Sequence, residues 1–162
     1  MPNNSTLRAA RIMLVMVAAV GLLILNPTTQ PKARAAVVTR AEKVHHALRI
    51  ALNKQGDPYR YGAAGPNAFD CSGLTSFAFH KAGFPRVPRT AAAQAGFVRH
   101  IRKAAMRPGD FVFFTSGGHV YHVGLFTGWH NGHRVIVHAP HTGTRGHKER
   151  LWTNAWFAGT MR

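Results

Sequence analysis

The sequence has few acidic residues: 5 Asp and Glu stand against 21 Lys and Arg, and the formal net charge is +16. The surface must therefore be positive almost everywhere, and we expect it to bind polyanions such as nucleic acid, anionic lipid or anionic cell-wall polymer. At 162 residues the chain is long enough for one ordinary domain with a tail, which excludes a two-domain enzyme.

The N-terminal segment lacks an apolar run of membrane-spanning length. Its uncharged run, residues 12–25, is shorter than the roughly 20 residues that a spanning helix needs. Arginines precede this run and the small residues Ala33 and Ala35 follow it, which is typical of a secretory signal peptide. We predict that residues 1–35 are a secretory signal peptide and that residues 36–162 form a single domain. Retention of the segment as a membrane anchor is the alternative.

Cysteine is almost absent, since Cys71 is the only one in the chain. A single cysteine excludes an internal disulfide, and its distance from the N-terminus excludes a lipid anchor on cysteine. In an exported protein such a residue is a buried apolar side chain, an intermolecular link or a working thiol.

The apolar pattern changes character along the chain, from helical spacing in the first half to strand-like runs in the second. Neither an internal repeat nor a low-complexity linker divides residues 36–162. The predicted order is helices followed by an antiparallel sheet, which is an α+β fold. Helices are expected at residues 40–54, 72–82 and 91–95, and strands at residues 111–114, 120–127, 134–138 and 152–160.

The position of Cys71 favours the working thiol, because it stands at the start of a predicted helix. Free N–H groups and the positive end of the helix dipole stabilise a thiolate there. Such a nucleophile needs a base, and the chain has 11 histidines. His122 and His138 lie in strand-like runs that could hold an imidazole rigidly, whereas most of the others lie in polar stretches.

A hairpin would bring these two histidines together. His122 and His138 pair directly, on one face, if the connection centres on position 130. The sequence Asn131-Gly132 instead favours a tight two-residue turn, which would place the rings on opposite faces. If both histidine rings are to lie on one face of the hairpin, the connection between the strands must be longer or bulged, and we predict such a connection.

A metal site is a competing interpretation of the histidines, because three pairs of them are spaced i, i+3. On strands this spacing turns the two side chains to opposite faces, and no nearby Asp, Glu or Cys completes a zinc set. We therefore predict no metal ligands. The three pairs are His119/His122, His130/His133 and His138/His141.

Several short motifs follow one another along the chain, at residues 57–62, 65–74, 88–90, 108–114, 122–125 and 138–140. With these motifs, in this order, the chain resembles the NlpC-type cell-wall cysteine peptidases over about residues 40–160. One departure is Tyr61-Gly62-Ala63-Ala64, where the family usually has Trp-Gly-Gly, and it affects the expected shape of the substrate groove.

The resemblance implies a papain-like α+β fold, in which N-terminal helices bearing the nucleophile pack on an antiparallel β-sheet. It implies that Cys71 is the nucleophile, His122 the general base and His138 the residue that orients His122. It further implies an oxyanion site and contacts to the charged ends of the substrate. Tyr59 matches the oxyanion position beside the backbone N–H of Cys71, and the substrate contacts match Asp70, Ser72 and Arg89.

By this resemblance the chain is a secreted peptidoglycan hydrolase, found outside the cell or associated with the wall. It would be a cysteine endopeptidase that cleaves stem peptides, at the bond from γ-D-glutamyl to the diamino acid, through a thioester acyl-enzyme. We expect no cofactor, a monomer, and anionic wall polymers as partners by charge. The export signal and the lack of a nucleic-acid motif exclude nucleic acid. The alternatives are an amidase or acyltransferase with the same Cys and His set, and a noncatalytic wall-binding module.

Overall fold

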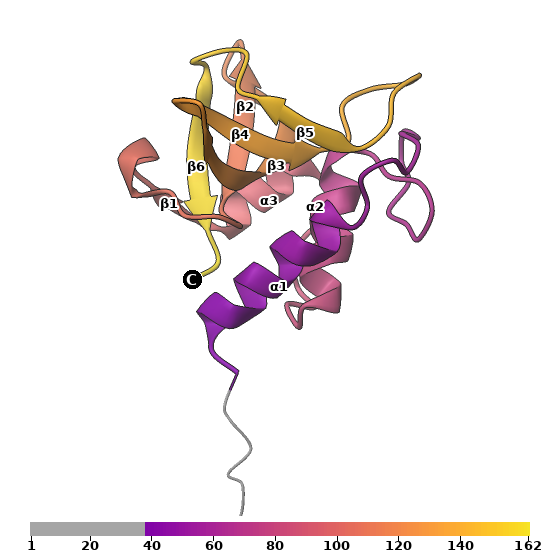
Figure 1. The fold of residues 1–162 in the computed structure, drawn as a ribbon, viewed down its shortest axis with the longest axis horizontal. Helices are drawn as coiled ribbons and strands as arrows, with labels where there is room; N and C mark the ends of the chain where they lie inside the picture. The colour runs from indigo at the N-terminus through magenta and orange to yellow at the C-terminus, as the bar shows by residue number, and fades with distance from the viewer. Residues whose placement is uncertain (1–37) are drawn as a thin grey trace, which may run out of the picture. The chain divides into compact units, whose positions relative to one another are not determined.

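The computed structural model describes residues 38–162, so the predicted signal peptide lies outside the described residues and stays a prediction. Three α-helices come first in this part of the chain, and Figure 1 shows them gathered against one side of a curved sheet. They are α1 (Arg40–Leu52), α2 (Cys71–Lys81) and α3 (Ala91–Phe97). None of the helices in residues 38–162 has the length and apolarity that a membrane crossing requires.

Six strands form one antiparallel sheet in the order β1-β6-β2-β3-β4-β5. The predicted class, an α+β fold with helices preceding an antiparallel sheet, is confirmed. The strands are β1 (Arg99–Ile101), β2 (Phe111–Ser116), β3 (His119–His130), β4 (His133–His138), β5 (His147–Arg150) and β6 (Trp156–Thr160).

Each helix begins at a side chain that accepts a hydrogen bond from the first turn, which is why the predicted starts are close to the observed ones. Thr39 and Glu42 form a capping box at α1. Asp70 caps α2 by accepting from the N–H of Gly73, and Thr90 caps α3 in the same way. Helix α2 begins at Cys71, one residue before the predicted start, so the cysteine occupies the first helical position.

The sheet buries apolar side chains on both faces, because alternate residues of its strands point in opposite directions. The larger cluster joins the helices to one face, where Phe111 and Leu125 meet Val44 and Phe79. A smaller cluster on the other face is formed by Val112, Phe114, Phe126, Ile136, Trp156 and Ala158. This packing on both faces holds the strands, and the side chains at their ends, in fixed positions.

The β3–β4 hairpin resolves the conflict over its turn. Asn131 and Gly132 form the tight two-residue turn, both with positive φ, and a bulge between Phe126 and Gly128 shifts the register by one residue. The predicted bulged connection is thus confirmed, but direct pairing of His122 with His138 is wrong. Beyond the bulge Leu125 pairs with Val137, so His138 stands beside Gly124 and is one diagonal step from His122 on the same face.

Two strands were not predicted. Among the described residues, strand β5 pairs with β4 alone, and all four of its residues are exposed, so the apolar alternation that marks a strand is missing. Strand β1 has three residues and, within 38–162, pairs with β6 alone. Conversely, the strand predicted to start at residue 152 starts at Trp156, after a connection from β5.

Candidate active site

Cys71 is held at the first position of α2 by the carboxylate of Asp70. This carboxylate accepts hydrogen bonds from the N–H of Gly73 at 2.7 Å and from the N–H of Gly62 at 2.9 Å. The first bond fixes the helix start and the second fixes the preceding loop. The thiol is half-buried, so it is accessible from the surface.

His122 and His138 form a buried pair on the neighbouring strands β3 and β4. His122 Nε2 and His138 Nδ1 are 2.8 Å apart, and the ring planes are inclined by 80°. This bond uses Nε2 of His122, so its other ring nitrogen is left for a partner. Phe114 and Trp152 stack on each other beside His122 and limit its contact with water.

One cavity of about 520 Å³ joins the thiol to both histidines. Its lining includes Cys71, His122, His138 and Tyr59, so the structure brings together all four residues that the sequence assigned to the reaction centre. Trp152 also lines it and was not predicted. Burial is the main cause that raises the pKa of Tyr59, so its hydroxyl stays protonated and able to donate.

The thiol and the imidazoles are neutral in the resting site. Burial raises the pKa of Cys71 despite hydrogen bonding from the backbone of Val123 and Ser72. Burial, with the nearby His141, lowers the pKa of His122 to about 4. Desolvation thus outweighs the stabilisation that the backbone at the helix start gives to a thiolate. A base must remove the thiol proton during the reaction.

Asp70, Ser72 and Arg89 form a network on the other side of Cys71. Arg89 binds the Asp70 carboxylate with both terminal nitrogens, at 2.9 and 2.6 Å, and also donates to the Ser72 hydroxyl at 3.1 Å. Burial would raise the pKa of Asp70, but the Arg89 and backbone hydrogen bonds outweigh it and lower the pKa. These three residues line a second cavity, of about 500 Å³, which Tyr59 and Cys71 share.

The Asp70 carboxylate is thus already paired with a cation. Its role within the protein is to anchor the start of α2 and to hold Arg89. The guanidinium is partly exposed and faces the second cavity, so Arg89 can present positive charge there. Together the two cavities flank Cys71, as a groove for an extended substrate requires.

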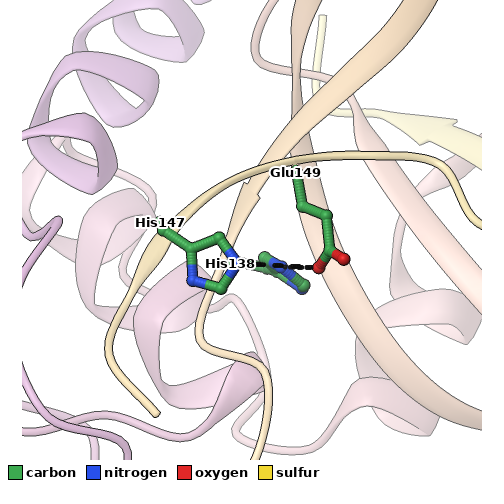
Figure 2. A group of neighbouring side chains, drawn as sticks. All are labelled: His138, His147 and Glu149. Atoms are coloured by element: carbon green, nitrogen blue, oxygen red, sulfur yellow. Dashed lines mark ion pairs between the residues drawn. The ribbon is translucent and has the colours of Figure 1, made fainter.

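Glu149 and His147, both on β5, lie behind His138 and were not predicted as site residues. The Glu149 carboxylate is 3.0 Å from His138 Nε2 and 3.6 Å from His147 Nε2. Figure 2 shows the three side chains side by side. The statement that no acidic residue lies near the histidines is therefore wrong, because β5 brings Glu149 beside β4. The only sequence signal was that Glu149 is one of 5 acidic residues.

Comparison with known proteins agrees with this geometry. The model of the NlpC/P60 family matches residues 56–161. A probable endopeptidase of Corynebacterium glutamicum is 40% identical over 114 residues, which are 70% of this chain and 51% of that protein. The bifunctional muramidase/DL-endopeptidase CwlT of Bacillus subtilis is 40% identical over 85 residues, or 50% of this chain and 26% of CwlT. The chain thus spans about half the length of the first of these two relatives and about a quarter of the length of the second.

A solved structure supports the same conclusion. The NlpC/p60 domain of the peptidoglycan hydrolase SagA superposes with a TM-score of 0.64 at 26% identity, and the match covers 73% of this chain and 98% of that one. The predicted fold and family are both confirmed. The chain belongs to the NlpC/P60 family, and it carries that family's peptidoglycan hydrolase domain.

Proposed function

We propose that this protein is a cysteine endopeptidase that acts outside the cytoplasm on peptidoglycan stem peptides. The bond cleaved is that from γ-D-glutamyl to the diamino acid, and the reaction passes through a thioester acyl-enzyme. The observation that carries the proposal is the single cavity in which the thiol of Cys71 meets the hydrogen-bonded His122–His138 pair. Similarity to a DL-endopeptidase supports the choice of bond.

The hydrogen bond between the histidines determines which nitrogen acts as the base. For His122 to accept the thiol proton, its Nδ1 must carry a lone pair, so its Nε2–H must donate to His138 Nδ1 at 2.8 Å. His138 then carries its own proton on Nε2, the nitrogen 3.0 Å from Glu149. His138 therefore fixes the tautomer of His122 as well as its orientation.

The reaction follows from these positions. His122 removes the thiol proton, and Cys71 attacks the carbonyl carbon to form a tetrahedral oxyanion. The backbone N–H of Cys71 and the Tyr59 hydroxyl stabilise this oxyanion. On collapse the C–N bond breaks, His122 protonates the leaving amine, and a thioester remains on Cys71. Water, deprotonated by His122, then hydrolyses the thioester and restores the thiol.

The network on the other side of Cys71 suits the acyl half of the substrate. Arg89 supplies positive charge for a carboxylate, and the Ser72 hydroxyl is a further polar contact at the cavity wall. Asp70 acts mainly by holding Arg89 in place, because its oxygens are occupied by hydrogen bonds.

Product analysis tests the bond. Peptidoglycan digested with the purified protein should yield new fragments that end in γ-D-glutamate, which mass spectrometry identifies directly. Release of intact stem peptides would instead show an amidase, and transfer of the peptide to an added amine would show an acyltransferase. Binding to walls without any new fragment would contradict an enzymatic function.

The pH profile tests the role of His122 as base. Above its lowered pKa of about 4 the imidazole is neutral and can accept a proton, and below that pH it is charged and cannot. In the presence of EDTA, kcat/KM should therefore fall on the acid side with an apparent pKa of about 4. The titratable groups that line the cavity with His122 are Tyr59, Cys71, Tyr121, His138, His141, His147 and Glu149.

A variant separates this cause from general acid sensitivity. The charge of His141 helps to lower the pKa of His122, so His141→Gln should move the acid limb to higher pH. Circular dichroism at each pH controls for unfolding. If the acid limb lay near the ordinary histidine pKa of 6.5 in both the unchanged protein and His141→Gln, burial would not control the pKa of His122.

The excess of basic residues suits retention on anionic wall polymers. Without the predicted signal peptide, residues 36–162 still carry a net charge of +12, which attracts a polyanion without a dedicated pocket, and such attraction is screened by salt. Binding to purified walls, measured by sedimentation, should weaken steadily as the Debye length falls from roughly 10 Å to 3 Å. Retention that is unchanged at 1 M salt would contradict an electrostatic mode of binding.

A further inference from the structure

We propose that His138, His147 and Glu149 form a binding site for a borderline divalent transition-metal ion such as Zn²⁺, and that an ion bound there inhibits the enzyme. Figure 2 shows the three side chains converging from β4 and β5. Their ligand atoms all lie within 4.8 Å of one another. Two imidazoles and one carboxylate are a ligand set that zinc accepts, with water completing the coordination.

The two spacings that involve the Glu149 carboxylate are close to those of tetrahedral coordination. Metal–ligand bonds of about 2.0–2.1 Å at tetrahedral angles place neighbouring ligand atoms roughly 3.3 Å apart. The Glu149 carboxylate oxygen is 3.0 Å from His138 Nε2 and 3.6 Å from His147 Nε2. The ligand nitrogens of His138 and His147 lie within 4.8 Å of each other, and rotation of the half-exposed His147 side chain can bring them closer around an ion.

The imidazoles already present the correct nitrogens. His147 Nδ1 lies 2.8 Å from the carbonyl oxygen of Arg145, and donation to this oxygen leaves a lone pair on His147 Nε2. His138 is only 1% exposed, and its Nε2 contacts Glu149 without the geometry of a hydrogen bond, so it is a buried nitrogen with no hydrogen-bond partner. A bound metal ion would give the Nε2 atom of His138 a partner.

The charges of the surroundings distinguish Glu149 from the other carboxylates. Asp57, Asp70 and Asp110 pair with Lys54, Arg89 and Arg162, and Glu42 belongs to the capping box of α1. Within residues 38–162, only imidazoles lie within ion-pair distance of Glu149. Glu149 and His147 are also about half exposed in the cavity that contains Cys71, so an ion from solvent can reach them.

Occupancy of the site reverses the hydrogen bond that the reaction needs. An ion on His138 Nε2 displaces the proton from that nitrogen, and the neutral ring then carries its proton on Nδ1. This N–H faces His122 Nε2, which must become the acceptor. The proton of His122 then moves to Nδ1, the nitrogen that must accept the thiol proton in the proposed reaction, so His122 can no longer act as the base. No proton is gained or lost by the pair.

The site itself follows from geometry, whereas its inhibitory effect rests on the proposed function of His122. Binding is therefore measured apart from activity, on the full chain carrying Cys71→Ala, because a thiol would also bind the probe. Titration with Zn²⁺ in a calorimeter should show one tight site per chain. Adding His147→Gln should weaken that site by about tenfold or more, whereas His133→Gln, which alters an exposed histidine of the β3–β4 hairpin, should not.

Inhibition is then measured with intact Cys71, each variant relative to its own activity in EDTA. Zn²⁺ should inhibit reversibly, and His147→Gln should raise the half-inhibitory concentration about as much as it weakens binding. Loss of the tight site on Cys71→Ala, or binding unaffected by His147→Gln, would overturn the proposed ligands. Tight binding without inhibition would overturn the coupling to His122. A protein that binds Zn²⁺ but is inactive in EDTA would contradict the proposed function and leave the binding site standing.

Discussion

Cys71→Ala is expected to abolish the release of soluble peptides from peptidoglycan, with a loss of at least about 10⁴-fold in kcat. The substitution removes the atom that forms the thioester, so water would have to attack the amide directly, and an amide is far less reactive toward water than the thioester that Cys71 forms. Binding and the oxyanion donors remain, so wall binding should persist. Turbidity clearance of purified walls and mass spectrometry of the soluble fraction measure the two effects.

The fold should tolerate this substitution, because alanine is a good helix former at the first turn of α2 and the thiol is only half-buried. The free energy of unfolding, measured by thermal denaturation, should therefore change by about 1 kcal/mol or less. His138→Gln is the informative comparison, since a side-chain amide can still accept from His122 Nε2. We expect a smaller loss of activity there than in Cys71→Ala. Hydrolysis by Cys71→Ala at more than a trace of the normal rate would disprove the assignment of Cys71 as the nucleophile.

The helical half of the fold could be predicted from the sequence because its signals are local. Thr39, Asp70 and Thr90 each cap a helix, and Gly56 and Gly83 follow the ends of α1 and α2 with positive φ. The histidines on β3 and β4 could be placed on one face because strand alternation is strict over short runs. Their roles came from the resemblance to a family, and nothing in composition alone would have selected them from 11 histidines.

The rest depends on contacts between distant segments. Strand β5 is a polar edge strand, so its pairing with β4, and hence the approach of Glu149 to His138, leaves no periodic signal. The diagonal register of the two histidines follows from a single bulge after Phe126. The protonation of the thiol depends on how deeply α2 is buried, because burial and helix position shift the pKa of Cys71 in opposite directions.

Gly73→Ala is expected to destabilise the protein by about 3 kcal/mol or more, although alanine normally favours a helix. A Cβ at Gly73 would lie 2.0 Å from the carbonyl oxygen of Ala63 and 3.0 Å from Cα of Ala64. Both are backbone atoms, so no side-chain rotation relieves the clash. The loop at residues 58–64 must then move away from α2. Chemical denaturation measures the loss of unfolding free energy.

The clash also reaches the reaction centre, because the Ala63 carbonyl accepts from the N–H of Asp70 and from Arg89. Moving it loosens the start of α2 and displaces Tyr59 relative to Cys71, so activity should fall even where the variant stays folded. Gly96→Ala is the matched control: this helical glycine has nothing within 4 Å of its added Cβ. It should stabilise the protein by about 0.5–1 kcal/mol and leave hydrolysis unchanged. Equal effects of the two substitutions would show that close packing of the loop on α2 does not hold the site together.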